Sequence, residues 1–240
     1  MSKPTYKELL DAGVHFGHMK RKWNPKMSQY IFAERKGIHI IDLNKTQSEL
    51  EKTAKAMKDL AKSGKKIMFV ATKKQASDIV KSAAESVNMP FVTHRWLGGM
   101  LTNFSTIRKS IKKMEKIESM LKDKSLTSIT KKEKLTLERE RNKLEKVLGG
   151  IRKLNRIPAA MYVVDIAKEH LAVKEAQKLN LRTFAMVDTN VNPNDVDYAI
   201  PANDDSTKSI EIITNYLTEA IKEGLEERAK KREEQEASVS

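Results

Sequence analysis

Residues 67–71 read IMFVA, an unbroken apolar run of the length of a β-strand. An apolar run without polar alternation is typical of a strand that is buried on both faces, as in a parallel sheet covered by helices. Gly64 ends a helical pattern just before this run, and a second helical pattern begins soon after it, at Gln75. The stretch therefore predicts a central strand of a helix-covered parallel sheet.

The same unit of strand and helix repeats along the chain. Short apolar segments alternate with segments whose apolar residues recur every three to four positions, which is the helical period. Strands that alternate with helices indicate an open parallel sheet with helices on both faces. The expected helices cover residues 46–63, 75–87, 168–179 and 206–222, and the expected strands cover residues 67–71, 91–92, 160–164, 183–187 and 198–200. We therefore predict an α/β fold with an open parallel, Rossmann-like sheet of four to five strands flanked by helices.

Three segments carry the Thr-x-x-Glu pattern of a capping box, in which two side chains accept hydrogen bonds from free amides at the start of a helix. These segments begin at Thr5, Thr46 and Thr130. Each of them predicts the first turn of a helix.

The segment between Phe104 and Leu154 breaks the alternation of strands and helices. Two narrow apolar seams stand on either side of a polar link at 123–129, the first at Ile107, Ile111, Met114, Ile117 and Leu121, and the second at Leu137, Leu144, Leu148 and Ile151. Two such helices joined by a short loop predict an inserted antiparallel coiled-coil helical hairpin. We therefore expect a discontinuous sheet domain at 1–102 and 158–224 and a protruding basic hairpin at 103–157. The charged tail at 225–240 is expected to begin as a frayed helix and then to be disordered.

The composition restricts the class of protein. The 240 residues include no cysteine, which excludes disulfides and thiolate metal sites. No apolar run approaches the roughly twenty residues of a membrane helix, and the N-terminus lacks the apolar core of a signal peptide. We therefore expect a soluble, cytoplasmic protein without a membrane partner.

The formal net charge of +14 predicts a polyanionic partner, and this charge is unevenly distributed. Residues 1–74 and 103–157 each carry 17 Lys or Arg against 7 Asp or Glu, whereas residues 158–240 carry 10 against 16. The basic segments are either RNA-binding surfaces or solvated helix faces. We expect RNA against the two basic segments, and basic proteins or solvent against the acidic end.

The densest cationic run is residues 20–26, KRKWNPK. Its cations neutralise phosphates, and Trp23 either stacks on a base or ribose or anchors its loop in the core. The chain has no RNP-type aromatic strand, GXXG loop or zinc knuckle, so we expect no base-by-base reading of single strands. Two further cations stand on an expected turn before Gly37. The predicted RNA-binding residues of this region are Lys20, Arg21, Lys22, Trp23, Lys26, Arg35 and Lys36.

A second candidate for RNA binding is residues 90–106, PFVTHRWLGGMLTNFST. It places Arg95 and Trp96 at the exit of a strand, before two glycines where the chain turns sharply or admits another backbone. Thr102 or Asn103 then offers an oxygen to the free amides of the next helix, whose N-terminus attracts anions. The segment is either a position for an RNA phosphate or a structural corner with a buried tryptophan.

An enzyme is the alternative class, because sheets of this kind often bind nucleotides at the carboxyl ends of their strands. The chain has neither the G-x-G-x-x-G nor the G-x-x-x-x-G-K-[ST] pattern. Lys73 and Lys74 follow the first parallel strand instead, and we expect them to contact phosphate on the outer surface. Asp165 and Asp188, each at a strand end, either hold Mg²⁺ for phosphoryl transfer or cap the segments that follow.

The histidines give little support to a metal site. His15 and His18 are three residues apart, but no cysteine or carboxylate near them in the sequence completes a tetrahedral site. His39 alternates with isoleucines in a strand-like run and is expected to be structural. We therefore predict no catalytic residue, no metal and no cofactor.

Three long segments carry a family resemblance. They are residues 12–43 (AGVHFGHMKRKWNPKMSQYIFAERKGIHIIDL), residues 94–107 (HRWLGGMLTNFSTI) and residues 187–206 (VDTNVNPNDVDYAIPANDDS). In this order they resemble the small-subunit ribosomal protein S-two family in its bacterial form. The resemblance extends over roughly residues 5–222.

The resemblance implies an α/β sheet domain with a protruding coiled-coil hairpin, and a structural, non-enzymatic role in the small ribosomal subunit that supports subunit assembly and translation initiation. The implied partners are small-subunit rRNA, neighbouring ribosomal proteins and the large messenger-binding protein S-one, with no small-molecule substrate. Carried onto this sequence, the rRNA contacts fall on Lys20, Arg21, Lys22, Lys26, Arg35, Lys36, Arg95 beside Trp96, Arg108 and Lys109. The alternative is a general RNA-binding or chaperone module that uses the same cations.

Overall fold

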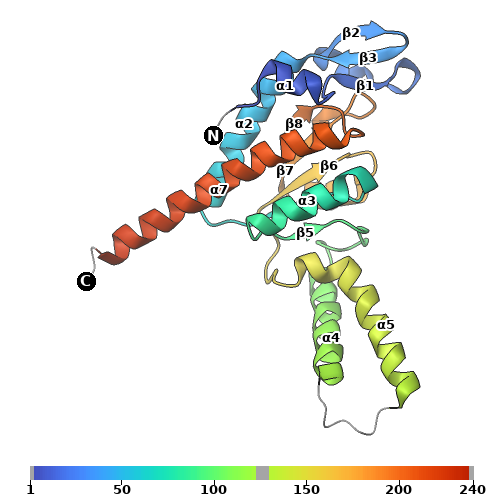
Figure 1. Cartoon of the computed structure of the whole chain (residues 1–240), viewed down its shortest axis with the longest axis vertical. Coiled ribbons are helices and arrows are strands. Elements are labelled where there is room, and N and C mark those ends of the chain that lie inside the picture. The colour runs from blue at the N-terminus through green and yellow to red at the C-terminus, as the bar shows by residue number, and fades with distance from the viewer. Residues whose placement is uncertain (1–2, 123–129, 238–240) are drawn as a thin grey trace.

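The centre of the molecule is a parallel sheet with the strand order β5-β4-β6-β7-β8 (Figure 1). The computed structural model describes residues 3–122 and 130–237. Every neighbouring pair of strands in this sheet is parallel. The strands are β4 (Ile67–Val70), β5 (Phe91–Val92), β6 (Ala160–Val164), β7 (Arg182–Val187) and β8 (Tyr198–Pro201). The predicted α/β fold with an open parallel sheet is confirmed, and the sheet has five strands.

Helices cover both faces of this sheet. Neighbouring residues of a strand point to opposite faces, and here the side chains on both faces are apolar and pack against helices. Phe69 packs in the layer of α2, α3 and α7, whereas Met68 packs in the layer that contains α6 and the base of α4. The bounds of the covering helices are α2 (Leu43–Lys62), α3 (Lys74–Ser86), α6 (His170–Lys178) and α7 (Thr207–Ala237). Within the described residues, no helix has the length and apolarity needed to cross a membrane.

Two of the three predicted capping boxes are confirmed. Thr5 caps α1 (Tyr6–Asp11), and Thr130 caps α5 (Lys131–Leu148), each with the reciprocal glutamate contact. The box at Thr46 is wrong, because α2 begins earlier, at Leu43, with Asp42 as its cap. Thr46 is instead buried inside the helix, where its hydroxyl donates to the Pro201 carbonyl at 2.6 Å.

Helix α7 lies against α2 at short range because Gly224 faces the α2 backbone. A Cβ atom at Gly224 would come within 2.4 Å of the Lys58 carbonyl oxygen. Lys58 also pairs with Glu223 at 3.0 Å and with Glu227 at 2.8 Å. These contacts and the many strong helix formers after residue 224 explain why α7 continues to Ala237. The helix expected at the start of the tail is present and continues to Ala237. The expected disorder beyond it stays a prediction, and residues 238–240 lie outside the described part of the chain.

The basic segment after β5 forms two helices that contact each other and extend away from the sheet (Figure 1). They are α4 (Phe104–Lys122) and α5, and a 3-10 turn, η3 (Gly149–Ile151), follows α5. Four of the five residues in the predicted α4 seam are buried, and Ile107 and Ile111 share an apolar layer with Met68 of the sheet. The link at 123–129 lies outside the described residues. The coiled-coil character of this pair and the domain boundaries at 103 and 157 stay predictions.

Residues 16–41, here called the N-terminal arm, form a separate antiparallel sheet with the order β1-β3-β2. Its elements are β1 (Phe16–Met19), the 3-10 turns η1 (Lys20–Lys22) and η2 (Pro25–Tyr30), β2 (Ile31–Arg35) and β3 (Ile38–Ile41). The arm lies at the end of the molecule opposite α4 and α5 (Figure 1). His39 is buried in β3, so its predicted structural role is confirmed.

Candidate nucleic-acid interface

The backbone of the N-terminal arm holds its cations on turns. Arg35 ends β2, and Lys36 and Gly37 form the connection to β3 with φ angles of 51° and 75°. Positive φ at both central residues is the type I′ geometry, whose twist matches that of a β-hairpin. In the other connection, Asn24 caps η2 by accepting a hydrogen bond from the Lys26 amide at 3.0 Å.

Most cations of the arm are exposed and unpaired. Lys20 is the exception, because its ammonium pairs with Glu34 at 2.8 Å. Five others have no carboxylate within 4.0 Å among the described residues, and they are Arg21, Lys22, Lys26, Arg35 and Lys36. These five side chains therefore keep a positive charge that the chain does not neutralise by direct pairing.

The surroundings of Trp23 agree in part with each of the two interpretations that the sequence allowed, namely stacking on RNA and anchoring the loop. Its ring is 5.1 Å from the ring of buried His39, at a tilt of 42°. The residue is nevertheless 36% exposed. Part of the indole thus packs against the arm, and the remaining part is accessible to a partner.

The segment 94–102 presents Arg95 outward and buries Trp96. Arg95 is exposed, and no carboxylate of the described chain pairs with it. Trp96 is only 6% exposed, and its indole N–H donates to the Glu175 carboxylate at 3.1 Å. The prediction that Trp96 contacts RNA is therefore wrong, because its ring is enclosed by protein.

The predicted phosphate position in this segment is filled by the chain itself. Glu175 on α6 accepts hydrogen bonds from the backbone amides of Gly99, Leu101 and Thr102 at 2.7, 2.9 and 3.0 Å. A carboxylate satisfies these donors as a phosphate oxygen otherwise would. The Arg95 side chain is therefore the group of this segment that stays free for an anion.

Lys73 and Lys74 have different surroundings. Lys73 is largely buried, and its ammonium lies 2.8 Å from Asp165, 2.7 Å from Asp204 and 2.8 Å from Asp205. The prediction that Lys73 contacts phosphate on the outer surface is wrong, since three carboxylates already surround it. Lys74 is exposed in the first turn of α3, as predicted for a surface contact.

The carboxylates around Lys73 come from the carboxyl edge of the parallel sheet. Asp165 follows β6, Asp188 follows β7 and Asp204 follows β8, and their exposed fractions are 6%, 1% and 1%. Burial, together with the neighbouring carboxylates of Asp165 and Asp188, raises the pKa of Asp204 to about 7, although Lys73 opposes this shift. The edge is therefore a cluster of buried ionisable groups in which the pKa of Asp204 depends on the charges of its neighbours.

His18 brings the N-terminal arm to the same edge. Its Nδ1 lies 2.9 Å from an Asp188 carboxylate oxygen, and its backbone amide donates to the Thr189 hydroxyl at 2.8 Å. The hydrogen bond that the His18 imidazole donates to the Asp188 carboxylate raises the pKa of His18 above its ordinary value, although burial acts in the opposite direction. The arm is thus attached to the central sheet by contacts after β7.

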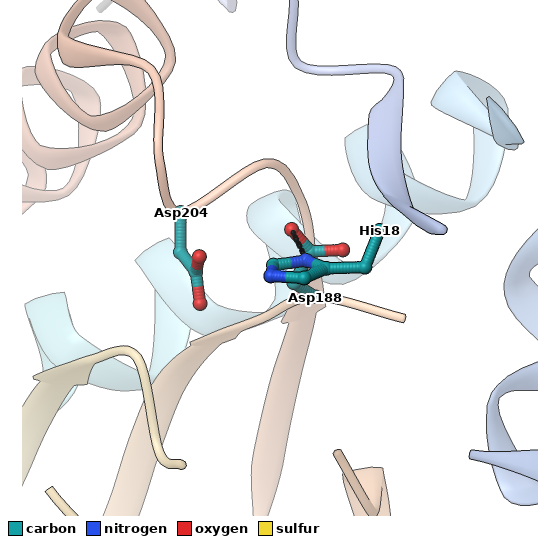
Figure 2. Close-up of side chains that lie close together, drawn as sticks. All are labelled: His18, Asp188 and Asp204. Carbon is teal, nitrogen blue, oxygen red and sulfur yellow. Dashed lines mark ion pairs between the residues drawn. The ribbon is translucent and has the colours of Figure 1, made fainter. Parts of the chain in front are cut away.

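Figure 2 shows that His18, Asp188 and Asp204 converge on one point. One ligand atom of each lies within 4.8 Å of the others, and an imidazole with two carboxylates is a donor set that suits a divalent cation. A cation bound there would compete with the hydrogen bond between His18 and Asp188 and with the Lys73 ammonium. Asp188 and Asp204 are far from His18 in the sequence, so their proximity to it was not visible from the spacing of the histidines.

The alternative of a magnesium-dependent enzyme used Asp165 and Asp188. The structure pairs Asp165 with the Lys73 ammonium and Asp188 with the His18 imidazole, so each carboxylate is held by a separate side chain. This arrangement stabilises the edge of the sheet, and it does not favour the alternative.

Two predicted contacts lie at the start of α4. Lys109 is exposed, whereas Arg108 is half-buried and donates from Nη1 to the Arg152 carbonyl at 3.1 Å. Arg108 therefore joins α4 to the segment after η3, and Lys109 is the cation that faces solvent.

Two groups of this region escaped the sequence analysis, namely Glu175 and the contact between His18 and Asp188. Glu175 stands on an ordinary amphipathic helix, and its partners lie more than seventy residues earlier in the chain. A glutamate at the middle of a short helix carries no signal for such a role. The position of Asp188 at a strand end and the match of residues 187–206 to a family pattern both pointed to this region, but neither indicated His18 as its partner.

Comparison with known proteins gives a consistent result. A family model described as Ribosomal protein S2 matches residues 9–224. Among similar proteins, the small ribosomal subunit protein uS2 of Parabacteroides distasonis is 57% identical over 238 residues, which cover 99% of this chain and 86% of that protein. The uS2 protein of Cytophaga hutchinsonii is 56% identical over 237 residues, covering 99% and 92%. That of Flavobacterium johnsoniae is 57% identical over 232 residues, covering 97% and 91%.

Proposed function

The chain belongs to the ribosomal protein S2 family, and we propose that it binds small-subunit rRNA through the exposed cations of the N-terminal arm and through Arg95. It is a structural component of the cytoplasmic small ribosomal subunit and not an enzyme. Its partners are rRNA and other ribosomal proteins. Neither a general RNA chaperone nor a magnesium-dependent enzyme is favoured by this membership.

The single observation that supports the proposed contact is the set of unpaired cations on the arm. Lysine and arginine side chains that neutralise phosphates release the counterions bound to RNA, and this release favours binding. A cation already paired with a carboxylate contributes less, because binding must first break that pair. The side chains proposed to contact phosphate are Arg21, Lys22, Lys26, Arg35, Lys36, Lys74, Arg95, Lys109 and, with a smaller contribution because it is paired, Lys20.

Sedimentation of a gently prepared lysate tests this function. We expect the protein to migrate with small ribosomal subunits at equal stoichiometry in moderate salt and to be released only in high salt, since screening weakens phosphate contacts. Migration as a free protein at both salt concentrations would contradict the proposal. Equal binding to unrelated structured RNAs would favour the general RNA-binding module instead.

We further propose that the arm contacts a neighbouring protein, the messenger-binding protein S-one in particular. The proposal rests on exposed apolar side chains of the arm, since Phe16, Met19 and Ile38 are 48%, 47% and 36% exposed. Met19 and Ile38 are paired across β1 and β3, so the group is contiguous there. Contiguous exposed apolar surface is typical of protein contacts.

Replacement of Phe16 and Met19 by serine tests the second proposal. We expect small subunits that carry the double variant to keep this protein but to lose most of their S-one, measured by quantitative mass spectrometry of purified subunits. Leu171→Ser, at a residue of α6 that is 47% exposed, is the matched control and is expected to keep S-one. Full retention of S-one on the double variant would refute this proposal.

A further inference from the structure

One half-buried carboxylate, that of Glu175 on α6, accepts every hydrogen bond that links α6 to residues 96–102. Glu175 Oε1 accepts from the Trp96 indole at 3.1 Å and from the Gly99 amide at 2.7 Å. Its Oε2 accepts from the Leu101 amide at 2.9 Å, and from the amide and the hydroxyl of Thr102 at 3.0 and 3.2 Å. Both oxygens of the carboxylate are therefore used, and every donor comes from one short stretch of chain.

Packing and two backbone hydrogen bonds also fix the path of the segment. Trp96, Met100 and Leu101 are buried in the apolar layer that contains α6. Backbone hydrogen bonds join Met100 to Leu97 at 3.1 Å and Asn103 to Gly99 at 2.8 Å, and Gly99 has a φ of +82°. The amides of Gly99 and Leu101 are part-buried where they meet Glu175, so leaving them without an acceptor would be costly. The carboxylate therefore contributes to the conformation of this segment together with the packed side chains.

The hydrogen bonds from these donors favour the ionised form of Glu175. Burial alone would raise the pKa of Glu175, but the hydrogen bonds from Thr102, Leu101, Trp96 and Gly99 outweigh burial and hold the pKa below its ordinary value. The side chain is therefore ionised at neutral pH, when it acts as an internal anion for the segment.

We propose that Glu175 is a positioning residue for rRNA binding: it occupies the amides of segment 96–102 and thereby holds the preceding Arg95 in an outward conformation. The inference rests on the proposed function, in which Arg95 contacts a phosphate. It also assigns the phosphate contact to the Arg95 side chain rather than to the amides. RNA therefore meets this segment through a cation whose position is fixed from the opposite side by α6.

Measurement of affinity for purified small-subunit rRNA as a function of salt tests the proposal. For Arg95→Ala, we expect the slope of log affinity against log salt to flatten by roughly 0.7 to 0.9, the contribution of one phosphate. Glu175→Gln is expected to flatten the slope by a similar amount, because its amide group brings two N–H donors toward the N–H groups of the segment. The double variant is expected to lose no more than Arg95→Ala alone, since both changes remove the same contact.

Two controls separate positioning from other effects. Glu211→Gln makes the same change of charge at an exposed residue of α7 and is expected to leave the slope at its wild-type value. Hydrogen exchange is expected to become faster at the amides of Gly99, Leu101 and Thr102 in Glu175→Gln while the β4 amides stay protected. If Glu175→Gln does not fold, Glu175→Asp replaces it, and a slope between those of wild type and Arg95→Ala is expected.

The outcomes distinguish this proposal from the function on which it rests. An effect of Arg95→Ala with no effect of the Glu175 variants would overturn the positioning role and leave the phosphate contact in place. Additive losses in the double variant would overturn the positioning role as well. If Arg95→Ala keeps the wild-type slope, the contact of Arg95 with phosphate is absent, and both statements about this segment fail.

Discussion

Replacing Lys73 by methionine is expected to lower the free energy of unfolding by about 3–5 kcal/mol, the usual cost of removing one partner from a buried ion pair. The Lys73 ammonium lies within 2.8 Å of Asp165, Asp204 and Asp205. Asp165 and Asp204 are buried, so they cannot recover water when the ammonium is removed. Methionine fills a similar volume, which limits the effect to the lost charge.

Urea unfolding at neutral pH measures this cost, and the neighbouring residue supplies a control. Lys74→Met changes an exposed lysine without a carboxylate partner in the described chain, and we expect an effect within about 0.5 kcal/mol. Equal stability of the Lys73 and Lys74 variants would show that the carboxyl edge tolerates its negative charges without the ammonium.

The cost of Lys73→Met is also expected to depend on pH. The pKa of Asp204 rises from an ordinary 3.8 to about 7 in the folded chain. Between these two pH values the folded state therefore binds a proton that the unfolded chain has already lost. His18, whose pKa is also raised in the folded chain, acts in the same direction. The stabilisation from both protonated groups is present at low pH and is lost as pH rises through the folded pKa. A protonated Asp204 needs no ammonium, so the variant is expected to lose less stability at about pH 5 than at about pH 8.

The second large effect is expected for the double variant Arg21→Ala and Lys22→Ala. Both side chains are exposed and unpaired among the described residues, and each is proposed to neutralise one rRNA phosphate. The slope of log affinity against log salt is expected to flatten by about 1.5, since each phosphate contributes roughly 0.7 to 0.9. Incorporation of the protein into small subunits is expected to fall with it.

Two variants of the same region make this experiment specific. Arg21→Lys with Lys22→Arg keeps both charges and is expected to keep the slope near the wild-type value. Lys20→Ala is expected to flatten the slope by less than one full phosphate contact, because Lys20 is paired with Glu34 at 2.8 Å. A wild-type slope in the alanine double variant would mean that residues 21 and 22 do not touch phosphate.

The parallel sheet was predictable because its strands stand out in the sequence as short apolar runs between helical patterns. The run at 67–71 and the strand at 160–164 are apolar throughout, and burial on both faces requires this pattern. The N-terminal arm was not predictable in the same way. Its strands are short and only partly buried, so their composition does not alternate. The start of α2 was misplaced because the Thr46 hydroxyl donates to the Pro201 carbonyl of β8 and to the Asp42 carbonyl, and Asp42 is the residue that caps the helix.

In the candidate site too, the surroundings of a residue were predicted correctly where they are local, and not where its partners are distant. Exposed cations on turns, such as Lys36, were found from the sequence because their position depends on local residues alone. Lys73 and Trp96 were misjudged because their partners, Asp204 and Glu175, come from distant segments of the chain. The sequence pattern around a charged or aromatic residue is the same whether the folded chain leaves its side chain exposed or pairs it with a distant residue. Only the tertiary contacts decide which of the two holds.

The attachment of the arm has a consequence for the order in which the molecule is completed during synthesis. The hydrogen bond from His18 to Thr189 joins residues 171 positions apart. At roughly 5–20 residues per second, a ribosome needs on the order of 10–30 s to make the chain between them. During this interval the arm has its own antiparallel pairing but lacks the surface to which it attaches. The densest cationic run of the chain, residues 20–26, is therefore synthesised early and fixed in position late.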